Sequence, residues 1–129
     1  MKIVVIGGVA GGMSFAARMR RLDASAEITV VEKSGFVSYA NCGLPYYVGG
    51  VITDEAALVL QTPASLWKRF RLDVRVSSEV LRIDRDAKKV DVRNHVSGEE
   101  YSLDYDKLVF SPGASPVRPP IPGLSLIHI

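Results

Sequence analysis

The 129-residue sequence has a single cysteine, no long hydrophobic run and no marked excess of charge of either sign. A lone cysteine cannot form a disulfide within the chain, so we expect a free thiol kept in the reducing cytoplasm. The net charge of +2 provides no broad positive surface, so we expect no nucleic-acid partner and only local sites for anions. No run is long enough to span a membrane, and the start, MKIVVIGG, lacks the apolar length and cleavage site of a signal peptide.

The chain does contain enough apolar material for one modest core, with 47% hydrophobic residues, so we expect one domain or part of one. Residues 2–6 form a β-branched run that predicts a buried parallel strand entering a glycine turn. Apolar residues then recur at helical spacing over residues 10–22. A second parallel strand is predicted over residues 27–32, because strand, helix and strand fit within about 30 residues. Together these elements predict a βαβ unit.

A second layer is predicted after a helix that starts at Thr62 and Pro63, a capping residue followed by proline at the first helical position. Ser97 and Gly98 indicate a hairpin turn. The short strand-like runs of this part are residues 74–76, 80–84, 89–93, 100–103 and 107–110. The middle three predict an antiparallel meander, and the last predicts a return to the parallel sheet. The proline-rich segment after it is expected to be extended. The fold class is therefore α/β, a Rossmann-like domain with an inserted antiparallel meander.

The glycine turn GGVAGG can be aligned with the dinucleotide-binding pattern G-x-G-x-x-G. Gly7 would make the tight turn, and Gly12 would let the helix pack closely on the strand. Val9 stands at the middle position, where the pattern has glycine, although Gly8 and Gly11 loosen the backbone. A pyrophosphate could then approach the free N–H groups of the helix N-terminus. The alternative is a close-packed strand-to-helix corner without a ligand.

Glu32 is at the end of the second predicted strand and stands 20 residues after Gly12. A carboxylate at this point accepts hydrogen bonds from a ribose and repels a 2′-phosphate, which favours an adenosine cofactor with a free ribose, such as FAD or NAD. The turn alone does not choose between these two cofactors. The alternative is that Glu32 is a solvated strand end.

Cys42 lies ten residues after Glu32, in the segment SYANCGLPYYVGG. This segment leaves the carboxyl end of the sheet, where open α/β folds bind ligands. If a short helix begins at Gly43, the thiol lies near its N-terminus, which favours the nucleophilic thiolate. Ser38 and Asn41 make the setting polar. The alternative is that Cys42 is a small buried apolar residue, as free cysteines usually are.

Four stretches carry a resemblance to a known family: IVVIGGVAGGMSFAARMRRLD, VVEKSGFVSYANCGLPYYVGG, LQTPASLWKRFRLDVRV and YDKLVFSPGASPVRPPIPG. The chain resembles the N-terminal FAD-binding part of the single-cysteine pyridine nucleotide-disulfide oxidoreductases, above all coenzyme A-disulfide reductases, including forms with a C-terminal rhodanese domain. The resemblance implies that FAD occupies the glycine turn. It also implies that Cys42 cycles between a thiolate and a mixed disulfide with coenzyme A, and that reduced flavin, recharged by NADH or NADPH, delivers the electrons. One protein cysteine then suffices, because the partner sulfur comes from the substrate.

The resemblance also implies the site residues, with Cys42 as the catalytic residue. We expect no metal site. Ser111 and Gly113 stand where this superfamily often has Ala-Thr-Gly, a turn that passes near flavin. The expected cofactor-binding positions are Gly7, Gly8, Val9, Ala10, Gly11, Gly12, Glu32, Lys33, Ser111 and Gly113. The expected coenzyme A contacts are Ser14, Arg18, Arg21, Ser38 and Asn41. Phe70 stands where a further basic contact would be, so that contact stays unassigned.

Helical spacing supports part of this set independently. Ser14, Arg18 and Arg21 follow an i, i+4, i+7 pattern and form one polar stripe on the first helix. Arginine suits phosphate groups well. The alternative is that the two arginines only cover a solvated helix face.

The comparison with the family separates its subclasses. Related NADH oxidases and peroxidases carry a histidine where this chain has Ala10, so a peroxide-reducing role lacks its expected acid-base partner. Dithiol relatives use two cysteines a few residues apart, which Cys42 as the only cysteine excludes. Three readings stay open: a coenzyme A-disulfide reductase, a related enzyme that reduces polysulfide or oxygen, and a non-catalytic truncated nucleotide-binding module.

An enzyme of this family also needs a second glycine-rich βαβ unit for NAD(P)H and a C-terminal interface domain that commonly forms a homodimer. Neither is present in the sequence. We therefore expect residues 1–124 to be the N-terminal part of the FAD-binding domain. The ending LSLIHI resembles a translated sequencing adapter, so residues 125–129 are expected to be non-native.

Overall fold

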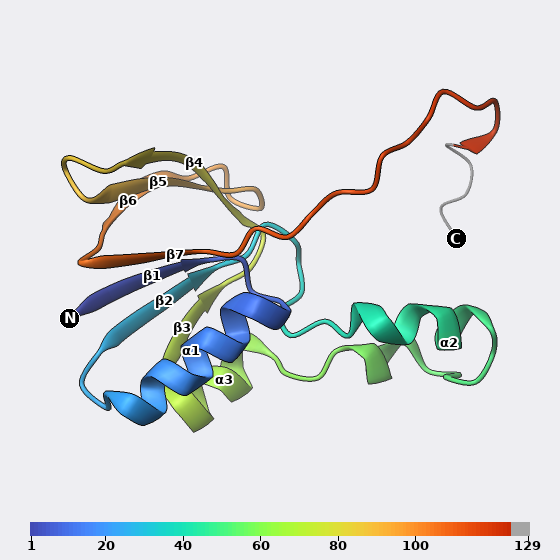
Figure 1. Ribbon diagram of the computed structural model, residues 1–129, viewed down its shortest axis with the longest axis horizontal. Helices are drawn as coiled ribbons and strands as arrows, with labels where there is room; N and C mark the ends of the chain where they lie inside the picture. Colours follow the sequence, from blue (N-terminus) through green and yellow to red (C-terminus); the bar gives the residue numbers. More distant parts are fainter. Residues whose placement is uncertain (125–129) are drawn as a thin grey trace.

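The computed structural model describes residues 1–124, so the expected adapter-derived tail at 125–129 lies outside the described residues. The centre of the molecule is a parallel sheet with the strand order β3-β2-β1-β7 (Figure 1). Its strands are β1 (Lys2–Ile6), β2 (Glu27–Val31), β3 (Leu72–Arg75) and β7 (Lys107–Phe110). The predicted βαβ start and the return of the chain to the parallel sheet are both confirmed.

Two helices cover one face of this sheet, α1 (Ala10–Leu22) and α3 (Pro63–Phe70) (Figure 1). Their apolar sides pack against the β-branched side chains of the strands, and the shared core includes Val5, Val30 and Leu72. Burial of such side chains is the main stabilising contribution to the fold. Alternate side chains of a strand point to opposite faces, so the same strands also have a second face to cover.

The N-terminus of α3 confirms the predicted capping residue. The Thr62 side chain accepts a hydrogen bond from the Ser65 backbone N–H, and the Ser65 side chain accepts one from the Thr62 backbone N–H. This reciprocal capping box satisfies two backbone donors at the helix start. Arg71 ends α3 in the left-handed region with φ +52°. The strand predicted at 74–76 therefore begins earlier, because the chain after Arg71 returns at once to the sheet and buries Leu72.

The opposite face of the sheet is covered by the predicted antiparallel meander, which Figure 1 shows as a separate layer. Its strands are β4 (Ser78–Asp84), β5 (Lys89–Asn94) and β6 (Glu100–Asp104). Val90 and Val92 are fully buried against Val4 and Val31 of the parallel sheet. The predicted hairpin turn is confirmed, with Gly98 at φ +74°. The fold is thus α/β, with helices on one face and a β meander on the other.

Between β2 and α3 the chain makes an excursion that extends from one end of the sheet (Figure 1). We call residues 38–60 the cysteine arm. It contains the 3₁₀ turn η1 (Asn41–Gly43), the helix α2 (Leu44–Val48) and the 3₁₀ turn η2 (Glu55–Leu58). The short helix expected after the cysteine is therefore present. The arm folds back on itself, because the Ala40 N–H donates to the Leu58 carbonyl over 2.8 Å.

After β7 the proline-rich segment is extended and exposed and runs away from the layers (Figure 1), as the sequence predicted. Among residues 1–124, no helix combines the length and the apolar character needed to cross a membrane.

Candidate cofactor and thiol site

The glycine turn between β1 and α1 is packed so closely that two of its glycines cannot be replaced without movement of the backbone. A Cβ atom on Gly12 would lie 1.8 Å from the Gly7 carbonyl oxygen, and one on Gly7 would lie 1.9 Å from the Ser111 carbonyl oxygen. Gly7 also has φ +101°, a conformation that favours glycine. The predicted roles of Gly7 in the turn and of Gly12 in close helix packing therefore fit the structure.

Ser111 closes the turn from the side of β7. Its N–H donates to the Ile6 carbonyl over 2.8 Å, and its Oγ would lie 2.5 Å from a Cβ on Gly11. Gly113, two residues later, has φ +72° and open space around it. The turn expected at Ser111 and Gly113 thus starts in direct contact with the glycine turn.

The N-terminus of α1 has the donor groups that an anion needs. Val9 is its N-cap residue and makes no side-chain capping hydrogen bond, and the first turn contains no acidic residue. The first backbone N–H groups of a helix have no partner within the helix, and the helix dipole adds a positive partial charge there. Helix α1 therefore presents uncapped donors beside Ala10 and Gly11, where the sequence predicted a pyrophosphate site.

Glu32 is buried at the end of β2, with 9% of its surface exposed. Its Oε2 accepts a hydrogen bond from the Gly8 N–H over 2.6 Å, and its Oε1 accepts one from the Ser34 N–H over 2.9 Å. A buried carboxylate is costly unless it is hydrogen-bonded, and these two backbone donors provide that compensation. The alternative of a solvated strand end is therefore wrong. Each oxygen keeps acceptor capacity for a further donor.

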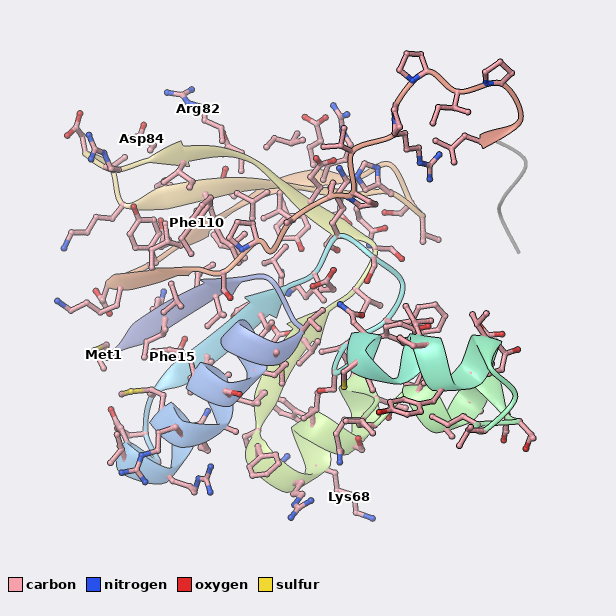
Figure 2. The ribbon with its side chains drawn as sticks, turned by 45° about the vertical axis from the view of Figure 1, so that its right-hand side comes forward. Met1, Phe15, Lys68, Arg82, Asp84 and Phe110 are labelled. Carbon is pink, nitrogen blue, oxygen red and sulfur yellow. The ribbon has the colours of Figure 1, made fainter. Side chains whose placement is uncertain are left out.

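A cavity of about 390 Å³ opens beside Glu32, between the end of the parallel sheet and the meander. We call it the sheet cavity. Its size lies in the range of small-molecule sites. Figure 2 shows Phe110 between the meander and the parallel sheet. The lining residues are Ile6, Gly7, Val31, Glu32, Lys33, Ser78, Glu79, Val80, Leu81, Arg82, Ile83, Phe110 and Pro112.

The rim of the sheet cavity carries a small charged cluster. Lys33 Nζ lies 3.1 Å from Glu79 Oε1, and His95 Nε2 lies 2.8 Å from Glu79 Oε2. The interactions with Lys33 and then with His95 hold the pKa of Glu79 below its usual value. Lys33, predicted as a cofactor residue, therefore lies at the edge of the cavity.

A second cavity of about 420 Å³ lies on the other side of the glycine turn, between α1 and the cysteine arm. We call it the thiol cavity. Cys42 is exposed, so the alternative of a buried structural cysteine is wrong. Cys42 lies in the 3₁₀ turn η1, directly before α2. The lining residues are Val9, Ala10, Met13, Ser14, Ser38, Tyr39, Ala40, Asn41, Cys42 and Leu60. Ser14, Ser38 and Asn41, three of the five expected substrate contacts, thus share one cavity with the thiol.

The other two expected substrate contacts do not line this cavity. Arg18 and Arg21 are exposed residues further along α1. The Arg21 Nε donates to the Ala17 carbonyl over 3.3 Å, within its own helix. The side chains at these two positions are therefore available only to the part of a ligand that extends beyond the thiol cavity.

The profile of the pyridine nucleotide-disulphide oxidoreductases matches residues 1–129 of this chain. The chain belongs to this family. It is 41% identical over 117 residues to the coenzyme A disulfide reductase of Staphylococcus epidermidis, covering 91% of this chain and 27% of that protein. The resemblance predicted from the four sequence stretches is thus confirmed. The chain spans about a quarter of the length of this curated relative.

Two solved structures share the fold of this chain. The reduced CoADR-RHD of Bacillus anthracis is 52% identical with a TM-score of 0.91, covering 96% of this chain and 22% of that chain. The NAD-dependent persulfide reductase of A. fulgidus is 43% identical with a TM-score of 0.90, covering 96% of this chain and 23% of that chain. The predicted Rossmann-like flavoprotein fold is confirmed by these similarities.

Members of this oxidoreductase family depend on FAD and NAD(P)H. The residues of the chain fit the adenosine diphosphate end of FAD, since a buried carboxylate borders an open cavity at the glycine turn, and the helix that follows this turn has an uncapped start. Glu32 would meet the ribose and the first turn of α1 the pyrophosphate. Among residues 1–124, no group of three or more metal-ligating side chains is present.

Sequence reasoning missed the contribution of β4 to the sheet cavity. Ser78, Glu79 and Val80 line it, although they are far from the glycine turn in the sequence. The run at residues 80–84 predicted the strand, but neither its first two residues nor the face of the sheet on which it would lie.

Proposed function

We propose that this chain is the N-terminal part of the FAD-binding domain of an NAD(P)H-dependent coenzyme A-disulfide reductase. Residues 1–124 would belong to this domain, and residues 125–129 would be a non-native tail. The NAD(P)H-binding and dimerisation domains would lie in the rest of a protein about four times as long, as the covered share of the relatives suggests. The complete enzyme would work in the cytoplasm as a homodimer.

The observation that carries the proposal is the single exposed thiol in a cavity beside the glycine turn. The cofactor would lie along the turn, with its adenosine end in the sheet cavity. Cys42 would be the catalytic nucleophile, and Ser14, Ser38 and Asn41 would contact coenzyme A around it. Arg18 and Arg21 would meet its phosphate groups further along α1. The cofactor contacts would be Gly7, Gly8, Val9, Ala10, Gly11, Gly12, Glu32, Lys33, Ser111 and Gly113.

In the proposed reaction the Cys42 thiolate attacks one sulfur of coenzyme A disulfide. A bond forms between Cys42 Sγ and that sulfur, the disulfide bond of the substrate breaks, and one coenzyme A thiolate leaves and takes up a proton. Bound FAD supplies the route by which two electrons from NAD(P)H reach the mixed disulfide. With two electrons and one proton, the bond between Cys42 Sγ and the coenzyme A sulfur breaks, the second coenzyme A leaves as a thiol, and the Cys42 thiolate is restored. No second protein cysteine is needed for this cycle.

A second candidate is the reduction of persulfide or polysulfide by the same thiol. The 43% identical structure is a persulfide reductase, and a terminal sulfur atom presents the same electrophile to Cys42. Oxygen reduction, as in an NADH oxidase, is a weaker candidate, because Ala10 supplies no acid-base group at the turn. A non-catalytic nucleotide-binding module is the candidate from another class.

The proposal is tested by comparing the rates of the full-length protein, loaded with FAD and NADH or NADPH, on coenzyme A disulfide, polysulfide and oxygen. The proposal predicts a clear preference for coenzyme A disulfide. The Cys42→Ser variant is expected to keep its flavin and lose disulfide reduction, whereas Ser97→Ala, in the exposed hairpin turn, should keep both. A preference for polysulfide or oxygen would contradict the substrate. Absence of flavin reduction under anaerobic NADH and NADPH would support the non-catalytic module.

A further inference from the structure

Ser38 stands at the start of the cysteine arm in a conformation that few non-glycine residues adopt. Its φ is +52°, in the left-handed region. An L-residue there brings its Cβ close to the following carbonyl oxygen, so glycine and asparagine accept the conformation best and β-branched residues worst. Such a conformation persists only where the surrounding structure fixes it, and strained residues of this kind gather at functional sites.

The surrounding structure fixes Ser38 through both of its backbone groups. Its N–H donates to the Gly8 carbonyl over 2.9 Å. Its carbonyl accepts a hydrogen bond from the Leu60 N–H over 3.3 Å, at the other end of the cysteine arm. Gly8 in turn donates its own N–H to Glu32 Oε2. Ser38 therefore ties the glycine turn to both ends of the arm that carries Cys42.

The next residues extend this connection to the thiol. Tyr39 forms an antiparallel bridge with Val59, and the Ala40 N–H donates to the Leu58 carbonyl. Cys42 follows four residues after Ser38, and both residues line the thiol cavity. A change in the backbone at Ser38 would therefore rotate Tyr39 and Ala40 together with the residues that they pair with. This rotation would move the Cys42 thiol relative to the glycine turn.

We propose that Ser38 is a positioning residue whose left-handed backbone, held by the bond to Gly8, sets where Cys42 lies relative to the cofactor. The inference rests on the proposed function, in which Cys42 must exchange electrons with a cofactor bound along the glycine turn. It concerns the backbone of Ser38 and is separate from the proposed contact of the Ser38 hydroxyl with coenzyme A. The backbone role acts on kcat and the hydroxyl contact acts on KM, so the same set of variants measures the two roles separately.

The test uses the full-length FAD-loaded enzyme and four variants, Ser38→Gly, Ser38→Asn, Ser38→Ala and Ser38→Val. A positioning role predicts that kcat falls far less in the Gly and Asn variants than in the Ala and Val variants, because glycine and asparagine accept the left-handed conformation, whereas loss of the hydroxyl acts on KM. The Val variant should lose about 100-fold in kcat, as expected for a misplaced reacting group. A hydroxyl contact without a positioning role predicts a raised KM for Gly, Ala and Val with the same kcat in all three, and that pattern would overturn the inference.

Ser77 provides a matched control, because it is also a serine with a left-handed backbone, at φ +49°. It lies between β3 and β4, outside the cysteine arm, and its N–H donates to the Ser34 carbonyl. Ser77→Val should lower the thermal stability of the enzyme but leave kcat per bound flavin unchanged. An equal loss of kcat in Ser77→Val and Ser38→Val would show that strain alone is responsible, and would overturn the inference.

A second readout separates the thiol from the flavin. The rate of flavin reduction by NADH under anaerobic conditions should be unchanged in the Ser38 series, while the rate of flavin reoxidation by coenzyme A disulfide should follow the order of kcat. If Ser38→Val does not fold, kcat of the other three variants still tests the positioning role. A lower kcat in Ser38→Ala than in Ser38→Gly and Ser38→Asn supports it, and an equal kcat in all three overturns it. Failure of the wild-type enzyme to reduce coenzyme A disulfide would refute the proposed function. An active wild type, with the same kcat and a raised KM in the Gly, Ala and Val variants, would refute only the positioning role of Ser38.

Discussion

Replacing Glu32 with glutamine tests how the carboxylate organises the cofactor site. Glu32 accepts one hydrogen bond at each oxygen, from the Gly8 N–H over 2.6 Å and from the Ser34 N–H over 2.9 Å. Glutamine offers one oxygen and one amide NH₂ in place of two oxygens. Whichever way the amide is turned, an N–H group faces one of the two backbone N–H groups. One buried or half-buried donor then loses its acceptor.

The lost backbone hydrogen bond is present with or without FAD and mainly stabilises the turn, so the size of the effect on binding follows from the hydrogen bond that the carboxylate would accept from the ribose. A hydrogen bond to a charged group contributes about 1.5 to 3 kcal/mol, and that range corresponds to about 10- to 150-fold in a dissociation constant. The Glu32→Gln variant lacks the charge that would accept the ribose hydroxyls, and the disturbed glycine turn acts in the same direction. We therefore expect FAD to bind Glu32→Gln at least about tenfold more weakly than wild type.

The assay is a titration of the flavin-free full-length protein with FAD, followed by flavin fluorescence. Glu79→Gln is the matched control, because Glu79 lines the same cavity but interacts with the side chains of Lys33 and His95 at its rim. Loss of such a partly exposed pair should weaken FAD binding by less than about fivefold. The reasoning is refuted if Glu32→Gln binds FAD as tightly as Glu79→Gln does.

Three further predictions concern stability. Gly12→Ala should lower the free energy of unfolding in urea by about 2 kcal/mol or more, because the new Cβ would lie 1.8 Å from the Gly7 carbonyl oxygen; an unchanged urea midpoint would contradict this packing. Thr62→Ala should cost about 1 kcal/mol in the same assay through the lost cap of α3, and full rescue by Thr62→Ser would support that cause. The pair between Glu79 and Lys33 lowers the pKa of Glu79 in the folded protein. The stability that this pair adds should therefore be fully present above about pH 4.3, the pKa of an unfolded glutamate, and should be lost as the pH falls through the lower pKa of folded Glu79. Thermal melting of wild type and Glu79→Gln should therefore converge at acid pH, and a difference that grows as the pH falls would contradict it.

The sequence predicted the local elements of the fold well. The first strand and the first helix have the predicted bounds, because β-branched residues and helical spacing indicate both unambiguously. The start of α3 was predicted from Thr62 and Pro63, since capping depends on neighbouring residues only. The start of β3 was missed by two residues, because the left-handed turn at Arg71 lets the strand begin at once.

Tertiary features of the site were harder to predict. Cys42 and Ser14 are 28 residues apart, and only the path of the cysteine arm brings them to one cavity. The buried state of Glu32 depends on backbone donors supplied by two loops, and no pattern of residue types specifies that geometry. The left-handed backbone of Ser38 was also unexpected, because the sequence has no glycine or asparagine there to indicate it. Long-range packing decides all three features.

The most direct test of the central claim is to look for the proposed mixed disulfide. The full-length protein, reduced with NADH or NADPH and then freed of nucleotide, would be treated with coenzyme A disulfide, quenched with acid, digested without a reductant and examined by mass spectrometry. The account predicts that the peptide containing Cys42 carries one coenzyme A, and that addition of NADH or NADPH before the quench removes it. An enzyme that consumes coenzyme A disulfide while the Cys42 peptide never carries coenzyme A would contradict the account.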